Sequence, residues 1–337
     1  MLKVFFSRMM TTIPALVGVV IVSFMLTRVL PGDTAAYFAG PAATPQAVEE
    51  VRKSLGLDRP LPEQFSRYVG DLSRGDLGHS LTTGQPVLAD LKSRLPASAE
   101  LTLFGLILSL LVAIPLGITA AVKQGSLIDH ACRAIATAGV SLPVFFTGLL
   151  LVYVFYFILQ VSPAPLGRLD VFASAPPTVT GFYLIDSIIA RDYQTFQASL
   201  SQLLLPGITL GIFSLAPIAR ITRASMLAVL SMEFIRTARA SGLSARTVIM
   251  TYAFRNAMLP VVTTLGMVFS FLLGANVLVE KVFAWPGVGS YAVEALIASD
   301  FAPVQGFVLA MAILYIALNL IIDLSYRLID PRMGATS

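Results

Sequence analysis

Six long apolar segments constrain this chain more than any other feature of its sequence. A helix needs about 20 apolar residues to cross the roughly 30 Å hydrocarbon core of a bilayer. The segments that reach this length are residues 9–30, 98–122, 133–160, 200–221, 258–280 and 303–324. None of them carries a charged residue in its central portion. We therefore predict six transmembrane helices in an all-α polytopic membrane protein.

The composition supports a membrane protein. Charged residues make up 12% of the chain, about half the share of a soluble domain. The arginines flank apolar runs and are not interleaved with aromatic residues, which argues against nucleic-acid binding. Cys132 is the only cysteine and both histidines, His79 and His130, lie outside the apolar segments. We therefore expect no metal site and no cofactor in this chain.

The first apolar run is longer than the core of a signal peptide. It extends from Met9 to Thr27, against 7–15 residues in a typical cleaved signal, so we expect a retained span. Lys3 and Arg8 precede this run, and residues 220–258 hold six arginines against Glu233. The positive-inside rule then places both termini and the 220–258 loop in the cytoplasm.

Residues 31–97 read as a small extracytoplasmic domain. Thr44 followed by Pro45 is typical of a helix start, and that helix should end near Gly56. Turns are expected at Gly75, Gly78 and Gly84. The sequence leaves open whether this domain is structural or a docking surface for an outside partner. A further short apolar stretch, residues 179–190, suits an interfacial or re-entrant helix better than a span.

The segment from Glu233 to Pro260 is rich in arginine although it lies between two apolar runs. It reads as a short helix, a break at Gly242 where a glycine ends a helix, and a second helix capped by Ser244. The second helix should run directly into the fifth span. A lipid-facing basic loop and a protein-docking helix both fit this pattern.

Helical spacing predicts two faces on this segment. Arg236, Arg239 and Arg246 are offset by three and seven residues, which would place them on one face. Phe234 and Ala238 should lie on another. Small side chains at Ala238, Ala240 and Gly242 would allow the helix to approach another surface closely.

Two motifs of this segment are EFIRTARASGL (233–243) and AFRNAMLPVVT (253–263). They resemble the cytoplasmic EAA loop in the version found in permeases of bacterial ABC importers for dipeptides and oligopeptides. Further similar motifs follow in order: LPGDTA (30–35), LGLDRP (55–60), GDLGHSL (75–81), RLPASAELTL (94–103), IPLGITAAVKQGSLID (114–129), SLPVFF (141–146), FAWPGVGSYAVEAL (283–296), PVQG (303–306) and NLIIDLSYRLIDPR (319–332). TGFYLID (180–186) resembles the dipeptide branch, and the chain as a whole is similar to the first permease subunit of that branch.

The resemblance implies a type I ABC importer permease fold. Residues 1–30 would form the first transmembrane helix, residues 31–97 an extracytoplasmic domain, and residues 98–330 the permease core with a cytoplasmic coupling loop at 223–258. The implied partners are a second homologous permease, two cytoplasmic ABC ATPases, an extracytoplasmic substrate-binding protein and membrane lipid. The nucleotide loop GxxxxGK[ST] is absent, so ATP and Mg²⁺ would be bound by the ATPases, and this chain would not be an enzyme.

The resemblance also implies roles for individual residues. The expected ATPase-docking helix comprises Glu233, Phe234, Arg236, Thr237, Ala238, Arg239, Ala240, Gly242 and Leu243. Thr264, Ser270 and Asn276 are polar candidates for the translocation pathway, although polar residues in spans also make ordinary helix–helix hydrogen bonds.

Other functions remain open at this stage. Permeases for nickel, glutathione and other small solutes share the family. An ion-coupled secondary transporter would normally place ionisable groups near the bilayer midplane, and the spans lack them. An intramembrane serine hydrolase would need a nucleophile and a base at matching depth, and no span holds a histidine.

Overall fold

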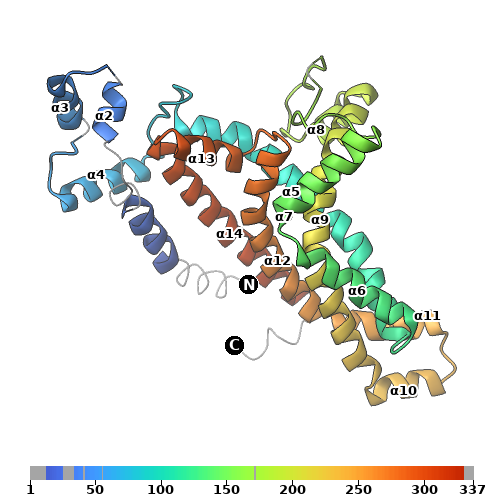
Figure 1. Cartoon of the computed structure of the whole chain (residues 1–337). Coiled ribbons are helices and arrows are strands. Elements are labelled where there is room, and N and C mark those ends of the chain that lie inside the picture. The colour runs from blue at the N-terminus through green and yellow to red at the C-terminus, as the bar shows by residue number, and fades with distance from the viewer. Residues whose placement is uncertain (1–12, 26–33, 41, 55, 171, 330–337) are drawn as a thin grey trace. The chain divides into compact units, whose positions relative to one another are not determined.

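The computed structural model describes residues 13–25, 34–40, 42–54, 56–170 and 172–329 (Figure 1). The ends of the expected first span and both chain termini lie outside these residues. Within the described residues the regular structure is helical, apart from one isolated bridge between His79 and Pro86. The expected all-α class is therefore confirmed.

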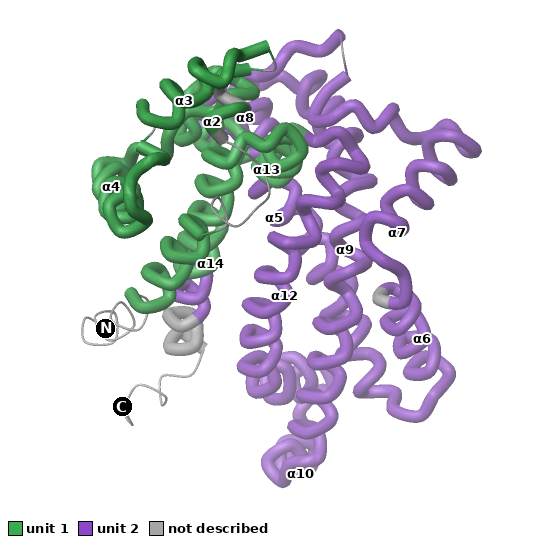
Figure 2. The backbone as a smooth tube through the Cα atoms, turned by 60° about the vertical axis from the view of Figure 1, so that its left-hand side comes forward, with its two compact units in different colours: residues 1–96, 286–317 green, residues 97–285, 318–337 purple. Residues whose placement is uncertain are grey.

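The chain forms two compact units (Figure 2). Unit 1 comprises residues 1–96 and 286–317, and unit 2 comprises residues 97–285 and 318–337. Two long helices, α5 (Val87–Val122) and α14 (Phe301–Ile329), each contribute residues to both units.

Unit 1 contains three short helices, α2 (Thr34–Ala39), α3 (Pro45–Ser54) and α4 (Leu61–Ser73), together with α13 (Val288–Ile297). The Thr44 hydroxyl accepts a hydrogen bond from the amide of Ala47 at 3.3 Å, so the predicted start of α3 is confirmed. The turns predicted at the glycines are also confirmed by positive φ angles at Gly56, Gly75, Gly78 and Gly84.

A small core and a buried carboxylate hold unit 1 together. Val87 and Leu91 from α5 pack against Val288 and Tyr291 from α13. The carboxylate of Asp300 accepts hydrogen bonds from the side chain of Ser80 at 2.8 Å and from the amides of Leu81 at 2.7 Å and Thr82 at 3.1 Å. Segments far apart in sequence are thereby tied into one body.

Unit 2 holds the largest apolar cluster. Its helices are α6 (Leu127–Ser141), α7 (Val144–Leu151), η1 (Val152–Ile158), α8 (Tyr183–Ile189), α9 (Tyr193–Leu230), α10 (Glu233–Ala240), α11 (Ala245–Thr247), η2 (Val248–Phe254) and α12 (Arg255–Val282), where η marks a π-helix. Helix α9 is central, since it packs against α6, α7, α8 and α12. Buried Leu203, Leu210 and Leu272 belong to this core.

Glycines allow α5 and α9 to pack closely. A Cβ atom on Gly117 would lie 2.7 Å from the Cβ of Thr222 and 2.8 Å from the carbonyl oxygen of Ala219. A Cβ atom on Gly105 would similarly lie 2.8 Å from the Cβ of Leu210. Small residues at such contacts are common between transmembrane helices, because they let the backbones approach.

Four helical runs in the described residues are long and apolar enough to span a membrane: Val87–Val122, Tyr193–Leu230, Ala245–Val282 and Phe301–Ile322. They overlap the predicted second, fourth, fifth and sixth spans. The first predicted span is described only over the short apolar helix Ile13–Met25. The predicted short helix in 179–190 is confirmed as α8.

The third predicted span, residues 133–160, is not one straight helix. Leu127–Gly139 and Val144–Ile158 are bent by 100° relative to each other. Leu142 has an extended backbone, with φ of −110° and ψ of 144°, because the ring of Pro143 disfavours helical geometry in the residue before it. The described residues therefore contain four spans, or five if this bent pair is one.

Candidate functional site

Helix α10 and the break that follows it have the predicted local structure. Gly242 has a φ of +77°, a left-handed conformation that suits glycine. The Ser244 hydroxyl then caps α11 by accepting a hydrogen bond from the amide of Thr247 at 3.2 Å. Arg239 lies in the last turn of α10, where a cation is favourable next to the helix dipole. The prediction of a helix, a glycine break and a second capped helix is confirmed.

One face of α10 is buried against the chain itself. Ile235 is fully buried and Ala238 nearly so, and both belong to a cluster with Met226, Val229 and Val248. The sequence analysis missed Ile235, although its spacing of three residues from Ala238 is a helical signal. Ala238, which we expected to allow close approach to a partner, contacts this internal cluster instead.

The other face of α10 and the loop after it are exposed. The exposed members of the predicted docking set are Glu233, Phe234, Arg236, Thr237, Arg239, Ala240, Gly242 and Leu243. Phe234 and Leu243 are large apolar residues with exposed fractions of 40% and 38%. This surface therefore combines positive charge with apolar side chains.

The arginines of the segment do not form the single row that the spacing suggested. Helix α10 ends at Ala240, and Arg246 belongs to α11 beyond the break, so the prediction of a shared face is wrong for Arg246. Arg236 pairs with Glu233 at 2.8 Å, and both side chains are mostly exposed. Such a surface pair contributes little to stability.

Helix α10 connects two long helices. Two residues, Ser231 and Met232, separate it from α9, and α11, η2 and α12 form one continuous helical run over Ala245–Val282 (Figure 1). Helices α9 and α12 also pack against each other. A displacement of α10 would therefore act on both of these helices.

The three pathway candidates lie along α12. Thr264 and Ser270 each donate to a carbonyl oxygen of their own helix, at Pro260 and Gly266, at 3.0 and 2.9 Å. Thr264 also borders a cavity of about 330 Å³ that is lined by Phe213, Ser214, Pro217, Arg220, Thr264, Met267, Val268 and Phe271. This cavity lies between residues of α9 and α12.

Asn276 belongs to a buried polar group between α5 and α12. Its amide donates to the carboxylate of Glu280 at 2.8 Å, and the Ser98 hydroxyl donates to the same oxygen at 2.5 Å. The indole of Trp285 donates to the carbonyl oxygen of Ala97 at 2.9 Å. These contacts join the part of α5 around Ala97 and Ser98, where α5 enters unit 2, to the end of α12.

A buried ion pair that the sequence analysis did not single out organises the segment before α8. Arg168 contacts Glu100 at 2.6 Å and donates to the carbonyl oxygen of Gly181 at 2.7 Å. Its guanidinium carbon lies 3.4 Å from the ring centroid of Tyr183. Glu100 also accepts from the amide of Leu184 at 2.9 Å. The only sequence signal was a glutamate at the edge of an apolar segment.

Known families match almost the whole chain. Residues 113–335 match the family described as binding-protein-dependent transport system inner membrane component, and residues 1–102 match the N-terminal family of such membrane components. The fold also resembles the MetNI methionine ABC transporter in its inward-facing conformations, with a TM-score of 0.51 and 16% identity over 69% of this chain and 93% of that chain.

Curated relatives are similar over nearly their full length. The probable D,D-dipeptide transport system permease protein DdpB of Escherichia coli K12 is 44% identical, covering 94% of this chain and 93% of the relative. The di/tripeptide transport system permease protein DppB of Pseudomonas aeruginosa UCBPP-PA14 is 39% identical, covering 99% of both. The chain therefore belongs to the family of binding-protein-dependent transport system inner membrane components, the permease subunits of ABC importers.

Proposed function

We propose that this chain is the transmembrane permease subunit of an ATP-driven importer of dipeptides and short oligopeptides. The names of the relatives support this substrate class, since DdpB and DppB are described as permeases for D,D-dipeptides and for di- and tripeptides. Nickel and glutathione permeases of the same family are the alternative. The termini and α10 lie in the cytoplasm in this proposal, on the basis of the positive-inside rule.

The proposed mechanism rests on one observation, that α10 is buried on one face and exposed on the other. Its inner face is fixed to the chain by Ile235 and Ala238, while Phe234, Arg236 and Arg239 are exposed. A helix that is firmly anchored and presents cationic and apolar groups suits docking into a groove with carboxylates. We assign that groove to a cytoplasmic ABC ATPase, which would bind the ATP and Mg²⁺.

Transport would then follow alternating access. Closure of two ATPases on ATP would displace α10, and the direct links to α9 and α12 would pass that displacement into the membrane. Each bound ligand shifts the two transporter states only by its differential affinity for them. A second homologous permease would complete the pathway, and an extracytoplasmic binding protein would deliver the peptide.

The remaining assignments are also proposals. Thr264 and Ser270 would lie toward the pathway, and the cavity beside Thr264 supports the first of them most directly. Asn276 is buried in the contact with Glu280, so the ordinary helix–helix hydrogen bond is the better assignment for it. The organisation into a first helix at 1–30, an extracytoplasmic domain at 31–97 and a permease core at 98–330, with the coupling loop at 223–258, follows the family resemblance.

Purification of the tagged chain from its native membrane tests this function. We expect a second permease and one or two ATPases to co-purify, and a variant lacking residues 233–243 to lose the ATPases while keeping the second permease. ATP-dependent uptake of a labelled dipeptide into proteoliposomes then tests the substrate. A chain that holds no ATPase, or peptide uptake that depends on an ion gradient and persists without ATP, would refute the proposal.

A further inference from the structure

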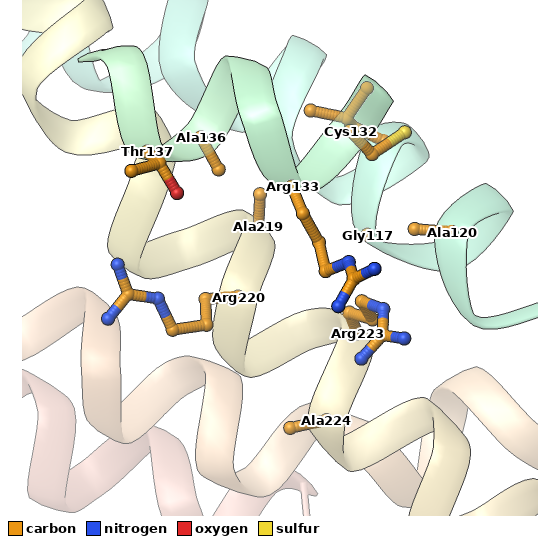
Figure 3. A pocket seen from close by; sticks show the side chains of 11 residues that line it. Gly117, Ala120, Cys132, Arg133, Ala136, Thr137, Ala219, Arg220, Arg223 and Ala224 are labelled. Atoms are coloured by element: carbon orange, nitrogen blue, oxygen red, sulfur yellow. The ribbon is translucent and has the colours of Figure 1, made fainter. Parts of the chain in front are cut away.

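A cavity of about 240 Å³ lies between α5, α6 and α9 (Figure 3). It is lined by Leu116, Gly117 and Ala120 of α5, by Cys132, Arg133, Ala136 and Thr137 of α6, and by Ala219, Arg220, Arg223 and Ala224 of α9. A water molecule takes up roughly 30 Å³ in the liquid, so the cavity is large enough for a polar headgroup. None of the individual residues assigned to ATPase docking or to the pathway lines this cavity, although Arg220 also borders the cavity beside Thr264.

Three arginines give the cavity a positive charge. Arg133, Arg220 and Arg223 line it, and Figure 3 shows the guanidiniums of Arg133 and Arg223 close together. Asp129 lies 2.7 Å from Arg223 and 3.8 Å from Arg133. One carboxylate for three guanidiniums leaves a local charge of +2, so the cavity is suited to an anion.

The rest of the lining is apolar. Leu116, Ala120, Ala136 and Ala219 supply hydrocarbon, and the small alanines leave the space that larger side chains would fill. A freely soluble anion has no apolar part that could be buried against these side chains. A molecule that joins a phosphate to an acyl chain would satisfy the arginines and cover the apolar surface together.

The location of the cavity also favours a lipid. Arg223 lies within the last turns of α9, which leads to α10 through two residues. If α10 is cytoplasmic, as the proposed function requires, the cavity lies at the cytoplasmic end of the membrane-spanning helices. Basic pockets between transmembrane helices on this side are suited to anionic lipid headgroups.

We infer that the cavity bounded by Arg133, Arg220 and Arg223 binds the headgroup of an anionic phospholipid. The phosphate contacts Arg133 of α6 beside Arg223 of α9, Arg220 adds positive charge from the other side of the cavity (Figure 3), and an acyl chain lies along the alanines. The lipid thereby joins α6 and α9 beside the segment that leads to α10. The position of the lipid on the cytoplasmic side of the membrane rests on the proposed function, whereas the binding of the lipid does not.

Native mass spectrometry of the full chain, purified in detergent, tests this inference. Dioleoyl phosphatidylglycerol is the anionic probe and dioleoyl phosphatidylcholine the zwitterionic one. Removing two surface charges in an R133Q/R220Q variant should weaken phosphatidylglycerol binding by about 30-fold. The matched control is R246Q, which removes an exposed arginine of α11 outside the cavity and should bind as the unchanged chain does.

A second variant tests the cavity without changing its charge. Thr137→Phe fills the space from an exposed position of α6 and should displace phosphatidylglycerol with all three arginines in place. Normal binding by both R133Q/R220Q and Thr137→Phe would overturn the inference. Equal binding of phosphatidylcholine, or full competition by glycerol 3-phosphate, would also overturn it, because either result removes the need for an anionic lipid. These measurements need no ATPase, so their failure is distinct from failure of the docking proposal.

Discussion

Arg223 holds Asp129 through two parallel hydrogen bonds. The Nε of Arg223 donates to Oδ1 and its Nη2 to Oδ2, each at 2.7 Å. Asp129 also accepts from the amide of Gly125 at 3.0 Å. A forked guanidinium–carboxylate contact is both strong and directional. It therefore fixes the start of α6 to the end of α9, close to the helix that we propose to dock on the ATPase.

Asp129→Asn should lower the thermal stability of the chain. The variant leaves the partly buried Arg223 without its carboxylate and loses the fork geometry. We expect a lower midpoint when the soluble fraction of detergent-purified protein is followed on heating. Asp170→Asn, which changes an exposed carboxylate, is the control. Equal midpoints for Asp129→Asn and the unchanged chain would show that the pair does not stabilise the contact between α6 and α9.

Arg239→Glu should reduce ATP-driven uptake by about tenfold or more, because it would set a negative charge against the carboxylates expected on the partner. Amounts of the variant in the membrane should not change, since Arg239 is exposed. Lys53→Glu makes the same charge change at an exposed position of α3 and should transport normally. Normal uptake by Arg239→Glu would argue against α10 as the docking surface.

Gly242→Val should uncouple ATP hydrolysis from uptake. A left-handed conformation costs an ordinary L-residue about 1–2 kcal/mol, and a β-branched residue fits it poorly. A Cβ atom at Gly242 would meet nothing within 4 Å, so the effect would come from the backbone and not from a clash.

Gly242→Asn is the informative comparison for that variant. Asparagine tolerates the left-handed region, so coupling should be largely retained. The ratio of peptide transported to ATP hydrolysed in proteoliposomes measures both variants. If valine and asparagine behave alike, the conformation at residue 242 does not position α10.

Gly117→Ala should destabilise the packing of α5 on α9. The added methyl group would meet the carbonyl oxygen of Ala219 at 2.8 Å, and overpacking of this kind costs roughly 1–3 kcal/mol. Gly274→Ala adds the same methyl group to α12 at a position where it would meet no atom within 4 Å, so this variant should not lower the stability of the chain. Thermal midpoints of the two variants in one detergent give the comparison. An unchanged thermal midpoint for Gly117→Ala would show that α5 and α9 can move apart to accept the methyl group without loss of stability.

Asp186 should make the structure around residues 179–189 sensitive to acid. Burial raises the pKa of its carboxyl, but hydrogen bonds from the amide and hydroxyl of Thr180 and from the amides of Gly181 and Val179 outweigh this, and the pKa lies below its ordinary value of 3.8. A carboxyl whose pKa is lower in the folded than in the unfolded chain stabilises the fold at pH values above the unfolded-state pKa. This stabilisation is lost as the pH falls through the folded-state pKa.

Hydrogen exchange measures this effect at single amides. After correction for intrinsic rates, the amides of Thr180 and Gly181 should be protected at neutral pH and lose protection as the pH falls below the ordinary carboxyl pKa of 3.8. Asp186→Asn should remove the protection throughout, whereas Asp170→Asn should not. Protection that persists in Asp186→Asn would show that other contacts hold this turn.

The sequence was sufficient to predict the features that depend on local chemistry. Long continuous apolar runs predict membrane helices because a helix satisfies all of its backbone hydrogen bonds within one segment, as lipid requires. Gly242 and Ser244 predicted the break after α10 because a glycine stop and a serine cap act within a few residues. Thr44 predicted the start of α3 for the same reason.

Features that depend on contacts distant in sequence were missed. The Glu100–Arg168 pair joins residues 68 positions apart, and no local pattern marks it. The burial of Ile235 likewise depends on Met226 and Val229 of α9 and on Val248 of η2, which the sequence of α10 does not contain. The bend before Pro143 had a local signal, since a residue before proline disfavours helical geometry. The continuous apolar run over residues 133–160 nevertheless led to the prediction of one straight span.

The π-helix η2 changes how faces must be assigned along the helix that enters the membrane. Its hydrogen bonds run from residue i to i+5, so each such turn holds one residue more than an α-helical turn. A helical wheel drawn without interruption from Arg246 to Thr264 would thus rotate every later side chain out of phase. Phasing counted from Arg255, where α12 begins, avoids this error. Residue choices in cysteine-scanning or cross-linking series along α12 should therefore be counted from Arg255 and not from α11.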